Sequence, residues 1–211
     1  MDDPVEVTPT PAATPENEHR LHRVVILAMA GGAFLVIAAV AVLTATGGRD
    51  QPSAMNAADP KVAASRAGCK LARHRDEGAS HTTKTVRYRS NPPTSGDHSP
   101  EPALDGLFDP GSEPRPEQLV HALEHGRVIL QYRPGIEPGP RAALEALFEE
   151  PVKGSPAYHT ILVQNGTEMS AAVAATSWTR SITCPRASPE AIAALRAFRE
   201  RYVDQAPELV P

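Results

Sequence analysis

The sequence predicts a small α+β domain, with a mixed or antiparallel sheet and flanking helices, preceded by one N-terminal transmembrane helix. Three observations lead to this fold class. Residues 24–46 are apolar and uncharged over their whole length. Beyond them, short runs typical of strands interleave with segments of helical periodicity. The two cysteines of the 211-residue chain, Cys69 and Cys184, both follow the apolar stretch, as expected of a domain outside the cytoplasm.

The N-terminal part divides into a tail and a membrane span. Residues 1–23 are rich in Pro, Thr and Glu, a composition that predicts a disordered tail. As a helix, residues 24–46 would cover about 34 Å, enough for a bilayer core of about 30 Å. A buried soluble helix or a cleaved signal peptide fits the length, uniformity and starting point of this stretch less well.

Charges beside the span predict its orientation. Arg20 and Arg23 lie on its N-terminal side, whereas Arg49 is the basic residue close on the other side. Because flanking basic residues are retained in the cytoplasm, we expect a single-pass protein of the cell membrane with a cytoplasmic tail and an extracytoplasmic C-terminal domain.

In that oxidising space Cys69 and Cys184 are expected to form a disulfide. The bond would close a loop of about 115 residues, worth about 4.8 kcal/mol in the chain-entropy description. Two unrelated buried thiols are the alternative. Metal ligation by both is disfavoured because neither lies in a Cys-x-x-Cys spacing.

The elements follow in order along the chain. Residues 47–66 are a linker with a short helix starting at Asp59-Pro60, and the extracytoplasmic α+β domain is expected over 67–211. Residues 85–89 alternate as a strand does, and the proline-rich stretch 91–102 predicts a rigid, extended loop. Further helices are expected over 116–125, over 138–150 and from Ser188-Pro189 onward, and further strands over 127–132, 160–164 and 171–178. The Asn165-Gly166 turn predicts that the last two of these strands form a hairpin.

The predicted helix 116–125 carries the most informative side chains. His121 and His125 lie one turn apart on the face opposite its leucines, with Glu124 between them in the sequence. The loop that carries His98 is the expected cover of this face.

Three or four imidazoles without cysteine suit Zn(II) or Cu(II). We therefore predict a copper or zinc site made by His98, His121 and His125, with His81 as the candidate fourth ligand. The thioether of Met169 would shift the preference towards copper, although a methionine there is more often a core or surface residue.

Two other interpretations of the histidines stay open. In the first, they donate hydrogen bonds to backbone carbonyls and brace the loop against the helix without a metal. In the second, His121-x-x-Glu124-His125 matches the inverted zinc-peptidase motif, and Glu124 would be the general base of a hydrolase. Because Gly126 ends the helix directly after His125, the hydrolase, and with it enzymatic activity, is the less favoured interpretation.

The charge balance argues against a nucleic-acid partner. The chain has 21 Lys and Arg against 25 Asp and Glu, a net charge of −4, and no basic stripe. The expected partner is the membrane that the span enters, and the sequence names no protein partner.

Three motifs resemble one known family. They are Pro-Pro-Thr-Ser-Gly-Asp-His at 92–98, the stretch Leu119–Tyr132, and Ala-Thr-Ser-Trp-Thr-Arg at 175–180. Together they are similar to DUF3105, a bacterial family of unknown function common in actinobacteria. The resemblance extends over roughly Gly68 to Glu208, with departures at Asp97, Ser177 and Thr179. It implies a membrane-anchored extracytoplasmic domain and no activity, so the metal hypothesis rests on the residues alone.

Overall fold

The computed structural model of the protein describes residues 59–210. The predicted tail 1–23, the predicted span 24–46 and most of the linker therefore lie outside the described residues. Between residues 59 and 210, each helix is too short or too polar to cross a bilayer.

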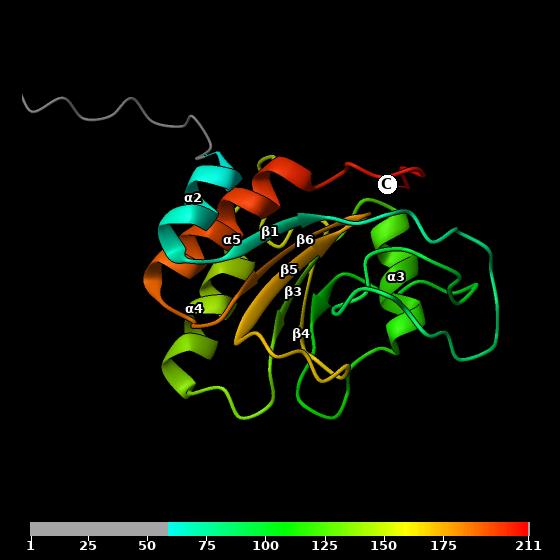
Figure 1. Cartoon of the computed structure of the whole chain (residues 1–211), viewed down its shortest axis with the longest axis horizontal. Coiled ribbons are helices and arrows are strands. Elements are labelled where there is room, and N and C mark those ends of the chain that lie inside the picture. The colour runs from blue at the N-terminus through cyan, green and yellow to red at the C-terminus, as the bar shows by residue number, and fades with distance from the viewer. Residues whose placement is uncertain (1–58, 211) are drawn as a thin grey trace, which may run out of the picture. The chain divides into compact units, whose positions relative to one another are not determined.

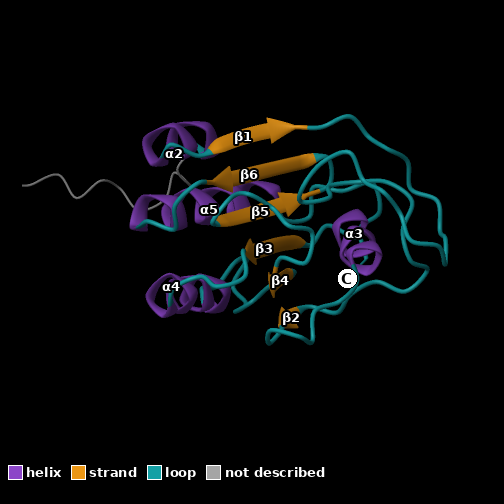
Figure 2. Ribbon diagram, turned by 60° about the horizontal axis from the view of Figure 1, so that its bottom comes forward, coloured by secondary structure: helices purple, strands orange, loops and turns teal. Residues whose placement is uncertain are grey.

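A six-stranded mixed sheet forms the centre of the domain. Its strands are β1 (Lys70–Arg73), β2 (Gly106–Leu107), β3 (Val128–Tyr132), β4 (Thr160–Gln164), β5 (Val173–Ser177) and β6 (Arg180–Cys184). Their order across the sheet is β1-β6-β5-β3-β4-β2 (Figure 2). β4 pairs in parallel with both β3 and β2, whereas β5 pairs antiparallel with β3 and β6, and β1 pairs antiparallel with β6. A mixed sheet in an α+β domain is therefore confirmed.

The helices of the described part each begin at a proline. They are α2 (Pro60–Ala67), α3 (Pro116–Glu124), α4 (Pro138–Glu149) and α5 (Pro189–Tyr202). Proline suits this position because its φ is already helical and its missing N–H needs no partner in the first turn. The Asp59 side chain accepts from the Lys61 amide, and the Ser188 hydroxyl accepts from the Ala191 amide, which caps α2 and α5. α2, α4 and α5 lie on one side of the sheet and α3 on the other (Figures 1 and 2).

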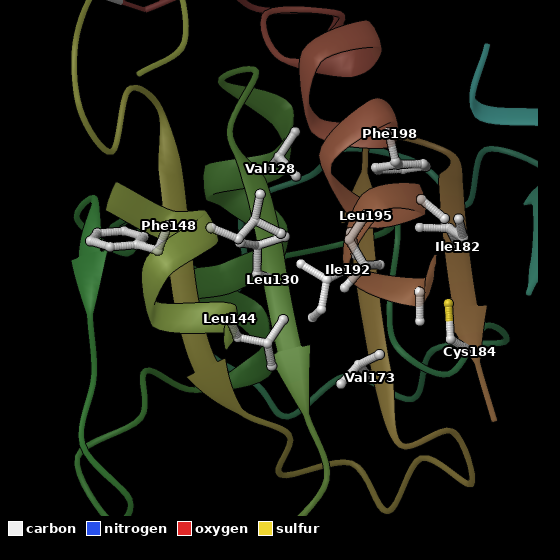
Figure 3. Packing of buried hydrophobic residues seen from close by; sticks show 14 of the residues in the cluster. Val128, Leu130, Leu144, Phe148, Val173, Ile182, Cys184, Ile192, Leu195 and Phe198 are labelled. Atoms are coloured by element: carbon white, nitrogen blue, oxygen red, sulfur yellow. The ribbon is translucent and has the colours of Figure 1, made fainter. Parts of the chain in front are cut away.

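The alternation of strand side chains supplies a separate hydrophobic core on each face. In β3, Val128 and Leu130 belong to the larger core and Ile129 to the smaller one. The larger core joins the sheet to α4 and α5 through Leu144, Phe148, Ile192, Leu195 and Phe198 (Figure 3). The smaller core joins the opposite face to α3 through Val120, Ala122, Leu123, Ile161, Val163 and Trp178. Both faces of β3 are covered, and all five of its residues are buried.

The predicted disulfide is confirmed. Cys69 and Cys184 are joined with an S–S distance of 2.03 Å, and no cysteine remains free. The bond links Cys69, the second residue after α2, to Cys184, the last residue of β6. Cys184 is a buried member of the larger core, and Cys69 packs against that core.

Two predictions about strands are wrong. Residues 85–89 form no strand, because carboxylates rather than a neighbouring strand satisfy their backbone: the Val86 amide donates to Glu117 and the Arg89 amide to Glu77. The predicted hairpin is also absent, because β4 and β5 pair with opposite edges of β3.

The true hairpin joins β5 to β6. Its turn contains Thr179, which adopts a left-handed φ of 57° without being a glycine. The Asn165-Gly166 segment is instead part of a longer loop, in which the Asn165 side-chain oxygen accepts from the amides of Thr167 and Met169.

Candidate metal centre

Helix α3 presents one face to the sheet and the other to a long loop. Val120 and Leu123 are buried in the smaller core, as helical periodicity requires. His121 and Glu124 face away from that core, yet they are 4% and 6% exposed, because the loop covers them. The helix ends at Glu124, and His125 is its C-terminal cap residue.

The covering loop runs between β1 and β2 and is proline-rich over 91–102, as predicted. Two of its segments pair through a short parallel bridge at His81 and His98, in which the Thr82 amide donates to the His98 carbonyl. The Ser99 amide donates to the Glu117 carbonyl, which attaches the loop to α3. The loop therefore folds back onto the helix and brings both of its histidines to the α3 face.

His98 is the most constrained residue of the cluster. It is fully buried, and its Nδ1 is 2.9 Å from the Gly96 carbonyl oxygen. This contact requires the proton on Nδ1, so in the neutral tautomer Nε2 carries the lone pair. Nε2 is 3.0 Å from Glu124 Oε2 but makes no hydrogen bond with it or with any other described group. A buried imidazole nitrogen is thus left without a hydrogen-bond partner.

His121 has the same arrangement. Its Nδ1 is 2.7 Å from the Ser99 carbonyl oxygen, which directs Nε2 into the cluster. Burial lowers the pKa of His121 to about 4, and nearby imidazoles, among them that of His98, lower it as well, against the effect of the Ser99 carbonyl. The ring is therefore neutral at physiological pH, which is the form that binds a metal.

Four residues meet in one group. His81, His98, His121 and Glu124 each offer a ligand atom, and these atoms all lie within 4.8 Å of one another. The imidazole centroids are 5.1 Å apart for His81 and His98, 4.9 Å for His81 and His121, and 4.7 Å for His98 and His121. Three imidazoles and one carboxylate are a donor set that could hold a divalent transition metal.

The predicted ligands are therefore divided between two groups. His81, His98 and His121 come together with Glu124, which the sequence analysis had not counted among the metal ligands. His125 belongs to a second group, with Glu124 and Glu208.

Sequence reasoning missed Glu208. Its backbone amide donates to the Glu124 carbonyl at 3.2 Å, so the C-terminal segment follows the end of α3. Glu208 lies in a non-periodic stretch with no recognisable motif, and nothing in the sequence pointed to it.

The other histidines of the described residues, and Met169, have other partners. His74 Nε2 is 2.8 Å from the Ser181 hydroxyl, and His159 Nδ1 is 2.6 Å from an Asp204 oxygen. Met169 is buried in the loop after β4, where its amide donates to Asn165.

The fold and the cluster define a class: an α+β domain with a His/Glu group of metal-ligand composition, of which His98, His121 and Glu124 are buried and His81 is exposed. The chain belongs to the family described as "Protein of unknown function (DUF3105)", whose family model matches residues 80–209. The match includes every residue of both ligand groups and excludes Cys69. No curated protein and no solved structure matches the chain.

Proposed function

We propose that this domain binds a divalent transition-metal ion, zinc or copper, through His81, His98, His121 and Glu124. The observation that carries the proposal is the Nε2 atom of His98, which is buried, makes no hydrogen bond, lies 3.0 Å from Glu124 Oε2 and belongs to a residue of the four-membered ligand group. Leaving such an atom unpaired costs about 1–3 kcal/mol. A bound ion would remove that cost.

The contacts behind the ligands support the same function. Metal-binding histidines usually donate the second ring N–H to a carbonyl or carboxylate, which fixes the tautomer and the ring plane. Gly96 and Ser99 supply such carbonyls to His98 and His121. Nitrogen and carboxylate donors without a thiolate favour Zn(II) or Cu(II) over Cu(I).

The location is also part of the proposal. We place the domain outside the cytoplasmic membrane, anchored by residues 24–46. The uncharged apolar composition of that stretch and the Cys69–Cys184 disulfide support this placement. There the protein would buffer, sense or hand on its metal ion.

A metal-free brace is the second candidate function. The bonds from His98 to Gly96 and from His121 to Ser99 attach the loop residues to one another and to α3 whether or not an ion is present. In the brace interpretation His121 Nε2 shares a hydrogen bond with His125 Nε2, and His98 Nε2 lies beside Glu124. In the metal interpretation the Nε2 atoms of His98 and His121 bind an ion, and this difference makes the two functions separable.

The experiment is elemental analysis of the full chain, purified in detergent without a chelating resin and then equilibrated with Zn(II) or Cu(II). Asparagine in place of His121 keeps a donor near the Nδ1 position and removes Nε2. We expect stoichiometric metal in the wild type and an affinity at least about 100-fold lower in His121→Asn, with the fold unchanged by circular dichroism.

The matched control is His74→Asn, which changes a histidine outside both ligand groups and should keep the full metal content. Absence of metal from the wild-type chain, together with an unchanged melting temperature after Zn(II) and Cu(II) are added, would establish the brace and overturn the metal proposal.

A further inference from the structure

A second group of ligand atoms adjoins the first. Glu124, His125 and Glu208 each offer one atom, all within 4.8 Å of one another. Glu124 is a member of both groups, and His121 of the first group and His125 of the second share a hydrogen bond between their Nε2 atoms, which are 3.0 Å apart. The two groups are therefore contiguous, with a carboxylate between them.

Backbone hydrogen bonds build the second group. The Asp204 amide donates to the Gly126 carbonyl and the Glu208 amide to the Glu124 carbonyl, so the C-terminal segment lies along the end of α3. Arg127 strengthens this attachment, since its Nη1 donates to the carbonyls of His125 and Val210. The position of Glu208 beside His125 is thus a consequence of main-chain geometry.

The side chains of the second group form no hydrogen bond with one another, and His125 and Glu208 are joined only by a long ion pair. His125 Nε2 is 3.8 Å from Glu208 Oε2, too long for a hydrogen bond. The Arg127 guanidinium is directed to Asp105 and to two carbonyls. The carboxylate of Glu208 is consequently available, and its side chain is 61% exposed.

We propose that the domain holds two divalent ions in a dinuclear centre. The inner ion is bound by His81, His98 and His121, the outer ion by His125 and Glu208, and the Glu124 carboxylate binds one ion through each oxygen. This inference rests on the proposed function and adds to it a second ion and a bridging ligand.

Charge and exposure support this assignment. Ions in two-metal sites are about 3.5–4 Å apart, a separation that a carboxylate spans with its two oxygens. The carboxylates of Glu124 and Glu208 offset part of the repulsion between the ions. Three of the four inner ligands, His98, His121 and Glu124, are buried and His81 is exposed, whereas in the outer group only Glu124 is buried and the Glu208 side chain is 61% exposed. The outer ion therefore binds more weakly and exchanges faster.

The test is a Zn(II) titration of the metal-free full chain, with bound zinc counted after equilibrium dialysis. The wild type is expected to bind two ions per chain. Glu208→Gln, an exposed and nearly isosteric change, should lower the affinity for the second ion at least about 10-fold and leave the first unchanged. The matched control is Glu200→Gln, an exposed glutamate of α5, which should bind as the wild type does.

Cu(II) gives an independent measure of the bridge. Two copper ions that share a carboxylate couple magnetically, so the second equivalent should reduce the mononuclear electron paramagnetic resonance signal in the wild type and not in Glu208→Gln. A mononuclear signal whose intensity grows in proportion to the added Cu(II) up to two equivalents overturns the carboxylate bridge.

The stoichiometry separates this inference from the proposed function. One ion per wild-type chain, unaffected by Glu208→Gln, overturns the dinuclear centre and leaves the single site standing. Two ions that both persist in Glu208→Gln also overturn it. No bound ion at all overturns both proposals.

Discussion

Removal of the Cys69–Cys184 disulfide should destabilise the domain more than an ordinary single substitution. The two residues are separated by 115 positions. For a loop of this length the chain-entropy relation gives about 16 cal/mol/K, or about 4.8 kcal/mol at 25 °C. Folded domains are stable by only about 5–15 kcal/mol, so the double variant Cys69→Ala/Cys184→Ala loses a large part of the total.

Packing adds a smaller contribution. Cys184 is fully buried, and replacing it with alanine removes its sulfur from the larger core. The reduced wild-type chain is the control, because it opens the loop and keeps both sulfurs. The difference between the reduced chain and the double variant therefore measures packing alone.

Urea unfolding of the full chain, followed by circular dichroism, measures the effect. We expect the free energy of unfolding to fall by about 2–5 kcal/mol in both the reduced chain and the double variant, and the melting temperature by about 4–20 °C. Oxidised and reduced wild type that unfold within about 1 kcal/mol of each other would refute the loop-entropy argument.

Metal binding should survive this change wherever the chain stays folded. Cys184 is the last residue of β6, whereas Trp178 precedes its first residue, Arg180, and lies beside His98, with ring centroids 6.4 Å apart. The disulfide therefore lies at the opposite end of β6 from the histidine cluster.

Two further predictions concern stability. Gly126→Ala places a Cβ 2.9 Å from the Asp204 Cα, at a φ of +86°. We expect this substitution to lower the free energy of unfolding, measured in urea, by about 1–3 kcal/mol. Gly139→Ala, whose Cβ meets nothing within 4 Å, is the control, and an equal loss of stability in both variants would contradict a steric clash at Gly126. The hydrogen bond from Arg196 lowers the pKa of Glu150 in the folded protein. The Glu150 carboxylate therefore stabilises the fold at pH values above the ordinary carboxyl pKa, and this stabilisation is lost as the pH falls through the lowered pKa. At pH 6 we expect Glu150→Gln to lower the free energy of unfolding by less than about 1 kcal/mol, because the ion pair is partly exposed. This loss should shrink when urea unfolding is repeated towards about pH 3. A loss of stability that grows on acidification would exclude this linkage.

Much of the helical structure could be predicted from local signals. Each helix begins at a proline, and Asp59 and Ser188 add side-chain caps, all of which are visible in the sequence. The larger strands β3 and β4 were also predictable, because buried central strands are continuous apolar runs.

Strand pairing was less predictable because it depends on distant residues. Asn165-Gly166 has the composition of a two-residue turn, but the Asn165 side chain accepts from the amides at 167 and 169 and stabilises a longer loop. Thr179, at the actual hairpin, carries no glycine signal. Residues 85–89 alternate like a strand, yet the carboxylates that take their amides are far away in the sequence.

The candidate site was predictable only in part, because it also depends on contacts between distant segments. His121, His125 and their common helix face follow from helical spacing, and the proline-rich segment indicated a stiff partner for them. The separation of His125 from His98, and the participation of Glu208, depend on how the C-terminal segment lies against α3. Main-chain bonds between distant segments set that arrangement, and no local pattern encodes them.

The two edges of the sheet bear on how the domain can associate. β1 begins at Lys70 and ends at Arg73, and β2 is only two residues long. Charged and very short border strands make poor templates for strand addition by another chain. Self-association through an extended β-ribbon is consequently disfavoured, and contacts with other molecules are left to helices and loops.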